Sequence, residues 1–244
     1  MLKFITILLL SVSFSLFADT SSIKKDLKSQ ILENSKNDKV SFVVFNLDNV
    51  LINTNVRYES IFNRYLKKNR SRVIKKYFNE KSFINIKLET VLADVENLKL
   101  SKRQKTKLKK FLEIEVNSDI TLDSDIAMMN SVDFVSDLHK NGAFIIYITK
   151  RNEKSLVKTV NTLNKFKFPI GVNNTTIIMS NSNNTKNTER NILSKWIKMG
   201  KIIAVFNNNL EILKSLKPYF KSNQLFYINS KNIKDNKIKT IKGF

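Results

Sequence analysis

Short apolar runs of strand length alternate along the chain with segments that show helical periodicity. The clearest run is Val40–Leu47 (VSFVVFNL), and similar runs follow at Ala143–Thr149 and Lys201–Phe206. These runs do not alternate between apolar and polar residues, which is typical of strands that are buried on both faces. Strands of this kind, separated by helices, predict an α/β fold with a parallel sheet and helices on both of its faces.

Weaker patterns complete the expected order of elements. The segment from Asp125 to Lys140 predicts an amphipathic helix that stops at Asn141-Gly142, a common C-terminal signal. The lysine-rich tail after Lys231 is expected to be frayed. The other expected elements are short strands at Thr175–Met179 and Leu225–Ile228, and helices around Ile23–Leu32 and over 153–165, 187–199 and 210–217.

The segment 1–18 has the pattern of a secretory signal peptide. Lys3 is followed by the apolar run Phe4–Phe17 and by the small residue Ala18. This run is shorter than the roughly 20 residues of a membrane-spanning helix. An uncleaved anchor stays an alternative, because Leu16 is large for its place two residues before the cut. We expect an exported protein, periplasmic or secreted, with no transmembrane segment in the mature chain.

Composition excludes several kinds of site. The chain has no cysteine, which rules out disulfides, thiolate zinc sites and cysteine nucleophiles. With four glycines, neither a Walker-type loop nor a GxGxxG fingerprint can be written. The one histidine, His139, leaves no multi-histidine metal site and argues against a Ser-His-Asp triad. It falls in the last turn of its expected helix, where positive charge suits the helix dipole.

Polar residues follow each of the three long apolar runs. They are Asn46-Leu47-Asp48-Asn49-Val50, then Thr149-Lys150-Arg151-Asn152, and then Asn207-Asn208-Asn209. Ligands of parallel sheets bind at the carboxyl ends of the strands. The sequence therefore places the candidate site at these three strand ends.

In this order the three clusters resemble motifs of the haloacid dehalogenase-like (HAD) phosphatase superfamily, and more narrowly of its exported class B and class C acid phosphatases. VVFNLDNVL holds the place of the DxDxT/V motif, with Asn46 at the nucleophile position and Asp48 at the general acid/base position. IIYITKRN is close to the class C form YITNR and supplies Thr149 and Arg151 for phosphate binding. The helix before it, MMNSVDFVSDLHKNG, resembles the PGAxxFxxxLxxxG segment.

Two further motifs of the resemblance lie in the last third of the chain. The phosphate-binding lysine is expected at Lys186, with Lys195 as the alternative. The GDNLxDF motif aligns with 207–213, which places Asn208 at the metal-binding position and Ile212 where a second acid is common. The resemblance thus implies a Rossmann-like, HAD-type core with a mostly helical cap insertion, and a Mg²⁺ site formed by Asn46, Asp48 and Asn208.

The amides at two of these positions change the expected chemistry. In the family the first aspartate attacks phosphorus and the last motif's aspartate helps to bind Mg²⁺. The neutral amide of Asn46 is a weak nucleophile, and that of Asn208 is a poor ligand for an ion that relies on carboxylates. Losing a nucleophile elsewhere costs on the order of 10⁴–10⁶ in turnover. We therefore expect a catalytically degenerate protein that binds Mg²⁺ weakly or not at all.

Positive charge near the expected pocket suggests what it binds. Lys186, Lys150 and Arg151 remain, while two carboxylates are missing, which favours a phosphorylated small molecule or another anion held without turnover. One alternative is an active Mg²⁺-dependent acid phosphatase that tolerates its amides.

The insertion suggests a second alternative, a basic polyanion-binding module. The expected domains are the signal peptide 1–18, a core of 19–55 and 119–244, and a cap insertion of 56–118. Between Arg57 and Glu115 there are 17 Lys and Arg against 7 Asp and Glu, in a chain of net charge +22. Basic residues interleaved with aromatic ones would suit nucleic acid. The aromatic residues of this segment are Phe62, Tyr65, Tyr77 and Phe78. Amphipathic helices that bury these rings and expose the lysines to water would give the same pattern.

A second acidic pair, Asp123-Ser124-Asp125, precedes the helix expected over 125–140. Carboxylates at that place commonly cap a helix N-terminus. We interpret the pair as an N-cap, with a metal site as the alternative.

Overall fold

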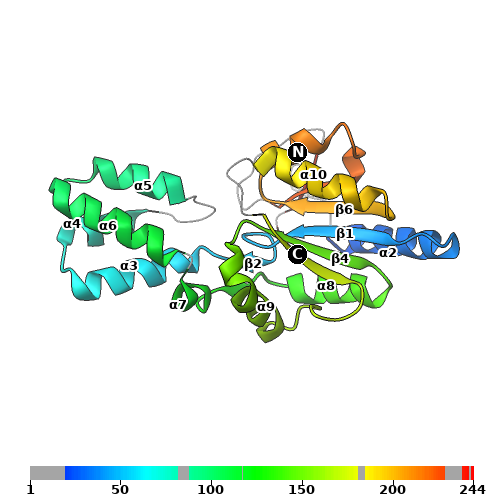
Figure 1. The fold of residues 1–244 in the computed structure, drawn as a ribbon, viewed down its shortest axis with the longest axis horizontal. Coiled ribbons are helices and arrows are strands. Elements are labelled where there is room, and N and C mark those ends of the chain that lie inside the picture. Colours follow the sequence, from blue (N-terminus) through cyan, green and yellow to red (C-terminus); the bar gives the residue numbers. More distant parts are fainter. Residues whose placement is uncertain (1–19, 82–87, 117, 181–184, 229–237, 242) are drawn as a thin grey trace, which may run out of the picture.

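The computed structural model describes residues 20–81, 88–116, 118–180, 185–228, 238–241 and 243–244 (Figure 1). The segment expected to be a signal peptide therefore lies outside the described residues. Within them, no helix is long and apolar enough to cross a membrane.

Six parallel strands form the central sheet in the order β5-β4-β1-β6-β7-β8. The α/β fold class predicted from the apolar runs is confirmed. β1 lies between β4 and β6, so the three long apolar runs are neighbours at the centre of the sheet. The strands are β1 (Ser41–Asn46), β4 (Phe144–Thr149), β5 (Thr175–Met179), β6 (Lys201–Asn207), β7 (Leu225–Ile228) and β8 (Lys239–Ile241).

Helices cover both faces of the sheet (Figure 1). Successive residues of β1 point to opposite faces, so Val43 and Phe45 pack on one side and Phe42 and Val44 on the other. Because both sides are covered, all four are buried, which explains why the four consecutive residues are apolar. The first face carries α2 (Thr20–Lys36), α8 (Ser131–Lys140) and α9 (Leu156–Lys165), and the second carries α10 (Thr185–Ile197) and α11 (Leu210–Leu216).

The described residues of the insertion form four helices around an apolar cluster of their own. Phe62 and Tyr65 are buried in this cluster, and the hydroxyl of Tyr77 donates to Asp94 at 2.9 Å. This is the arrangement of amphipathic helices with inward aromatics, and the buried rings of Phe62 and Tyr65 are not available to stack on bases. The helices are α3 (Val56–Lys68), α4 (Arg72–Glu80), α5 (Leu88–Asn97) and α6 (Lys102–Glu115).

A two-stranded antiparallel ribbon closes the base of the insertion. β2 (Ile52–Asn53) leaves the core and pairs with β3 (Ile126–Ala127), which returns to it after the short helix α7 (Asp119–Leu122). The predicted helix start at Asp125 is therefore wrong, because β3 occupies the next two residues. Asn130, at a left-handed φ of 59°, precedes the true start of α8 at Ser131. The N-cap interpretation of Asp123-Ser124-Asp125 fails for the same reason.

The end of the chain also differs from expectation. Lys239–Ile241 forms β8, which pairs in parallel with β7, so the prediction of a frayed tail is wrong for these residues. Ile238 and Ile241 are buried, and the ring of Phe244 packs against Phe134. Residues 231–237 lie outside the described part of the chain. Burial against β7 orders a strand that a lysine-rich local sequence does not indicate.

Candidate functional site

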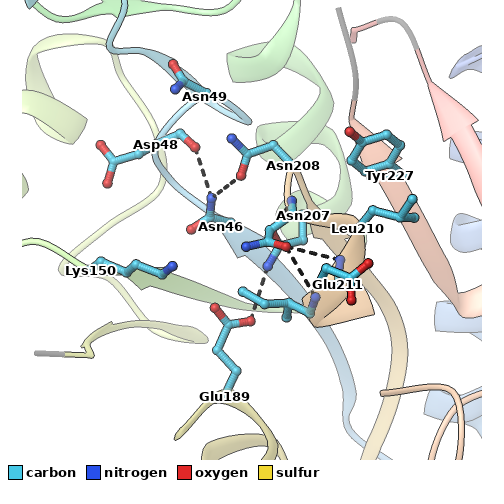
Figure 2. Close-up of a pocket in the computed structure, with 12 residues that line it drawn as sticks. Asn46, Asp48, Asn49, Lys150, Glu189, Asn207, Asn208, Leu210, Glu211 and Tyr227 are labelled. Atoms are coloured by element: carbon cyan, nitrogen blue, oxygen red, sulfur yellow. Dashed lines mark hydrogen bonds between the residues drawn. The ribbon is translucent and has the colours of Figure 1, made fainter. Parts of the chain in front are cut away.

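A pocket of about 370 Å³ opens at the carboxyl ends of β1 and β6 (Figure 2). Asn46 and Asp48 come from the end of β1, and Asn208 follows β6, so residues far apart in sequence meet in one place. Lys150 follows β4 and Glu189 projects from α10. The rest of the lining is Asn49, Asn207, Asn209, Leu210, Glu211, Ile212 and Tyr227.

The two amides at the centre of the pocket bond to each other. Nδ2 of Asn46 donates to Oδ1 of Asn208 at 2.9 Å and to the main-chain oxygen of Asp48, also at 2.9 Å (Figure 2). An amide nitrogen carries two hydrogens, so both are used. The –NH₂ group of Asn46 thus occupies the point toward which the two oxygens converge.

The same three residues are those expected to bind Mg²⁺, and their arrangement does not fit the ion. Mg²⁺ is held by oxygens and depends on carboxylates. Here the converging oxygens of Asn208 and Asp48 accept hydrogens from an uncharged amide. Across the described part of the chain, no group of three His, Cys, Asp or Glu could hold a metal. The three residues, as they are arranged, therefore do not form the Mg²⁺ site that the resemblance implies.

The carboxylate of Asp48 is engaged elsewhere. Oδ2 accepts from the hydroxyl of Thr149 at 2.7 Å, and Oδ1 accepts from Nη2 of Arg151 at 2.7 Å and from Nη2 of Arg57 at 3.1 Å. Burial alone would raise the pKa of Asp48, but the two guanidinium groups and the hydroxyl hold it well below its usual range. A carboxylate held ionised in this way is a poor source or acceptor of a proton.

Asp125 completes a buried group of four charges, which we call the charge quartet: Asp48, Arg57, Asp125 and Arg151. Nε and Nη2 of Arg57 donate to Asp125 at 2.6 and 2.7 Å, and Nη2 of Arg151 donates to it at 2.8 Å. Each arginine therefore contacts both aspartates. The Asp125 side chain is fully buried, whereas that of Asp48 is 25% exposed. The quartet joins Asp48, Asp125 and Arg151 of the core to Arg57 at the start of the insertion.

The charge quartet changes what the expected phosphate-binding residues can do. Thr149 and Arg151 lie beside the pocket, but their hydrogen-bond donors bond to the carboxylate of Asp48 and do not point to a free ligand position. Lys150 lines the pocket. Lys186 falls in the first turn of α10, and its side chain lies outside the described residues. Lys195 is in the last turn of α10 and does not line the pocket.

Glu189 and the pair Arg57 and Asp125 were not anticipated from sequence. Glu189 is buried, and one of its carboxylate oxygens accepts from Nδ2 of Asn207 at 3.2 Å (Figure 2). Burial raises its pKa to about 7, against the opposing effect of Lys150. Glu189 comes three residues after Lys186, so both lie on one face of a helix, and this spacing is the sequence signal that could have placed Glu189 near the pocket. Arg57 is at the start of the insertion and Asp125 lies in the core seven residues after its end, and no local pattern links them.

Comparison with known proteins supports the fold. No protein-family model and no curated protein sequence matches the chain. A haloacid dehalogenase-like hydrolase from Streptococcus pneumoniae matches with a TM-score of 0.54 and 10% identity, over 83% of this chain and 93% of that one. A protein assigned as a β-phosphoglucomutase from Thermotoga maritima matches with a TM-score of 0.56 and 10% identity, over 84% of this chain and 94% of that one. A protein assigned as a phosphatase from Clostridium difficile matches with a TM-score of 0.55 and 13% identity, over 78% of this chain and 85% of that one. The chain therefore has the HAD-like fold.

Removing one charge of the quartet should destabilise the protein strongly. Asp125→Asn leaves two buried guanidinium groups with only Asp48 to neutralise them, so we expect a loss of about 3–5 kcal/mol in the free energy of unfolding. Urea denaturation measures it. Arg57→Gln combined with Asp125→Asn restores the charge balance and should recover part of the loss.

The neighbouring Asp123 is the matched control. Its carboxylate is 61% exposed and pairs with Lys158, so Asp123→Asn should change the stability by less than about 0.5 kcal/mol. Equal effects of Asp123→Asn and Asp125→Asn would show that the quartet carries no special share of the stability.

Glu189 should make stability depend on pH. Because its pKa is raised to about 7 by burial, the folded protein keeps a proton that the unfolded chain releases above about pH 4.3. Stability should therefore fall between these two pH values, by at most about 4 kcal/mol, and level off above them. Urea denaturation across this range should show the fall in the wild type and its absence in Glu189→Gln. Glu211→Gln, at the exposed rim of the same pocket, should keep the fall; a flat wild-type profile would contradict the prediction.

Proposed function

We propose that this HAD-fold chain is an exported protein of the acid phosphatase type that has lost hydrolysis and holds a phosphate ester or a related anion in its pocket. The single observation that carries the proposal is the hydrogen bond between the amides of Asn46 and Asn208. It places two uncharged groups where the resemblance requires a nucleophile and a metal ligand.

Two further features support the loss of hydrolysis. The general acid/base position, Asp48, is ionised and shared between two arginines, so it has no proton to give to a leaving group. Ile212, where a second acid is common, is buried among apolar residues. Neither a nucleophile nor an acid is thus available at the positions that the resemblance assigns.

The charge of the pocket supports anion binding. Asn46 and Asn208 carry no charge, and that of Asp48 is balanced within the quartet. Lys150 contributes a positive charge to the lining, and Glu189, with a pKa near 7, is only partly ionised at neutral pH. Such a pocket repels an anion less than one that carries two more carboxylates.

The loss of hydrolysis is tested with p-nitrophenyl phosphate and Mg²⁺. The wild type should show no hydrolysis above buffer, because loss of a nucleophile costs on the order of 10⁴–10⁶ in turnover. Asn46→Asp combined with Asn208→Asp should raise the rate by at least about tenfold, since it supplies a nucleophile and two carboxylates for the metal. A strong wild-type rate that Asp48→Asn abolishes would instead establish an active phosphatase.

Binding is tested separately by isothermal titration with inorganic phosphate and p-nitrophenyl phosphate. The wild type should bind, and Lys150→Ala should weaken the affinity about tenfold, because a hydrogen bond to a charged group contributes about 1.5 kcal/mol. Lys198→Ala, at the opposite end of the sheet, is the control and should bind as the wild type does. No heat with the wild type would contradict binding and leave the loss of hydrolysis standing.

A further inference from the structure

A second pocket, of about 500 Å³, lies at the amino ends of β1 and β6, at the opposite end of the sheet from the site described above. Large apolar side chains gather at its rim. Val40, Ile197, Met199 and Tyr219 line it, and between 43% and 65% of each is exposed. Isolated exposed apolar residues are ordinary, but a group of them on one surface marks a place of interaction.

Three lysines surround these apolar side chains. Lys39, Lys198 and Lys201 line the same pocket and are exposed, with Asp38 as the one acidic residue of the lining. Within the described part of the chain, none of the three lysines forms an ion pair. We call the four apolar residues and the three lysines the amino-end surface.

The amino-end surface is formed by turns that surround the second pocket. Val40 precedes β1, Ile197–Lys201 joins α10 to β6, and Tyr219 follows α11. The turn at Gly200 approaches β1 so closely that a Cβ there would lie 2.6 Å from the main-chain oxygen of Val40. The ring of Tyr219 is supported by the guanidinium of Arg190, 5.0 Å from its centroid. These contacts hold the exposed side chains together at one end of the core.

We propose that the amino-end surface docks on an anionic lipid bilayer. Apolar side chains ringed by lysines suit such a bilayer, because the apolar groups enter the headgroup region while the ammonium groups meet lipid phosphates. An extended peptide that adds to a sheet needs a free strand edge. The edge strands of the described sheet, β5 and β8, lie away from this surface, which consists of turns at the ends of β1 and β6.

The position of the amino-end surface leaves the first pocket open when the protein is docked. The carboxyl ends of the strands, with the pocket and the insertion, face away from the amino ends (Figure 1). A protein held on a bilayer by its amino-end surface would present its ligand pocket to the solvent. The proposal does not depend on what that pocket binds.

Cosedimentation with vesicles tests the proposal. The chain from Asp19 onward is used, because the described fold begins at Thr20 and the apolar segment 1–18 would bind bilayers by itself. Vesicles of phosphatidylcholine are compared with vesicles that also contain phosphatidylglycerol. The protein should bind only the second kind, with an affinity that falls as salt is added.

Two matched triple variants locate the binding surface. Met199→Ser with Lys198→Glu and Lys201→Glu alters the amino-end surface. The control, Ile114→Ser with Lys67→Glu and Lys110→Glu, alters the insertion by the same charge and an equally exposed apolar residue, 60% against 65%. The first should lose at least about tenfold in vesicle affinity and the control less than about threefold, because charges near the bilayer contribute most.

Three results would overturn the proposal. The wild type could bind vesicles with phosphatidylglycerol no better than vesicles of phosphatidylcholine alone. The control variant could lose as much vesicle affinity as the first variant, which would place the contact on the insertion instead. The protein could also bind polyglutamate through the amino-end lysines while ignoring vesicles, in which case the partner is an acidic protein. Circular dichroism and thermal melting of both variants distinguish lost binding from lost folding.

Discussion

Four charged side chains, three of them buried, hold the pocket end of this molecule together at the junction of the sheet and the insertion. Burying an ion pair costs several kcal/mol per ion, and the cost is offset only where the partners satisfy one another. In the charge quartet each guanidinium contacts both carboxylates, so this condition is met. Arg57 lies at the start of the insertion and bonds directly to Asp125, the residue before β3, so this contact is next to the β2–β3 ribbon in sequence on both sides. The insertion is therefore tied to the core by two charged side chains as well as by backbone pairing.

The same arrangement determines what the pocket can do. Once Asp48 is shared by the two arginines, the hydroxyl of Thr149 and the guanidinium of Arg151 have an internal anion to bind. What remains at the strand ends is a pair of amides, Asn46 and Asn208, which satisfy each other. Because both side chains are uncharged amides that bond to each other, they leave no unpaired charge at the strand ends. An arrangement without an unpaired charge is compatible with a stable fold.

Much of the fold could be predicted because its signals are local. The apolar runs of β1, β4 and β6 identify buried strands without any knowledge of their neighbours, and the polar residues after them identify the end of the sheet where they meet. Asp125 could not be placed in this way, since its partners Arg57 and Arg151 are far away in sequence. An aspartate before a helical run has the same local pattern whether it caps a helix or pairs with an arginine. The strand β8 was missed for a similar reason, because its burial depends on β7.

The order of the strands has a consequence for how the chain acquires its shape. β1 lies beside β4 and β6, yet about 100 residues, including the whole insertion, separate it from the nearer of them along the chain. During synthesis this apolar strand has neither neighbouring strand to pair with until those later segments are made. An unpaired apolar strand can pair with the same strand of another molecule. Nascent chains of this protein are consequently most exposed to aggregation between the synthesis of β1 and that of β4.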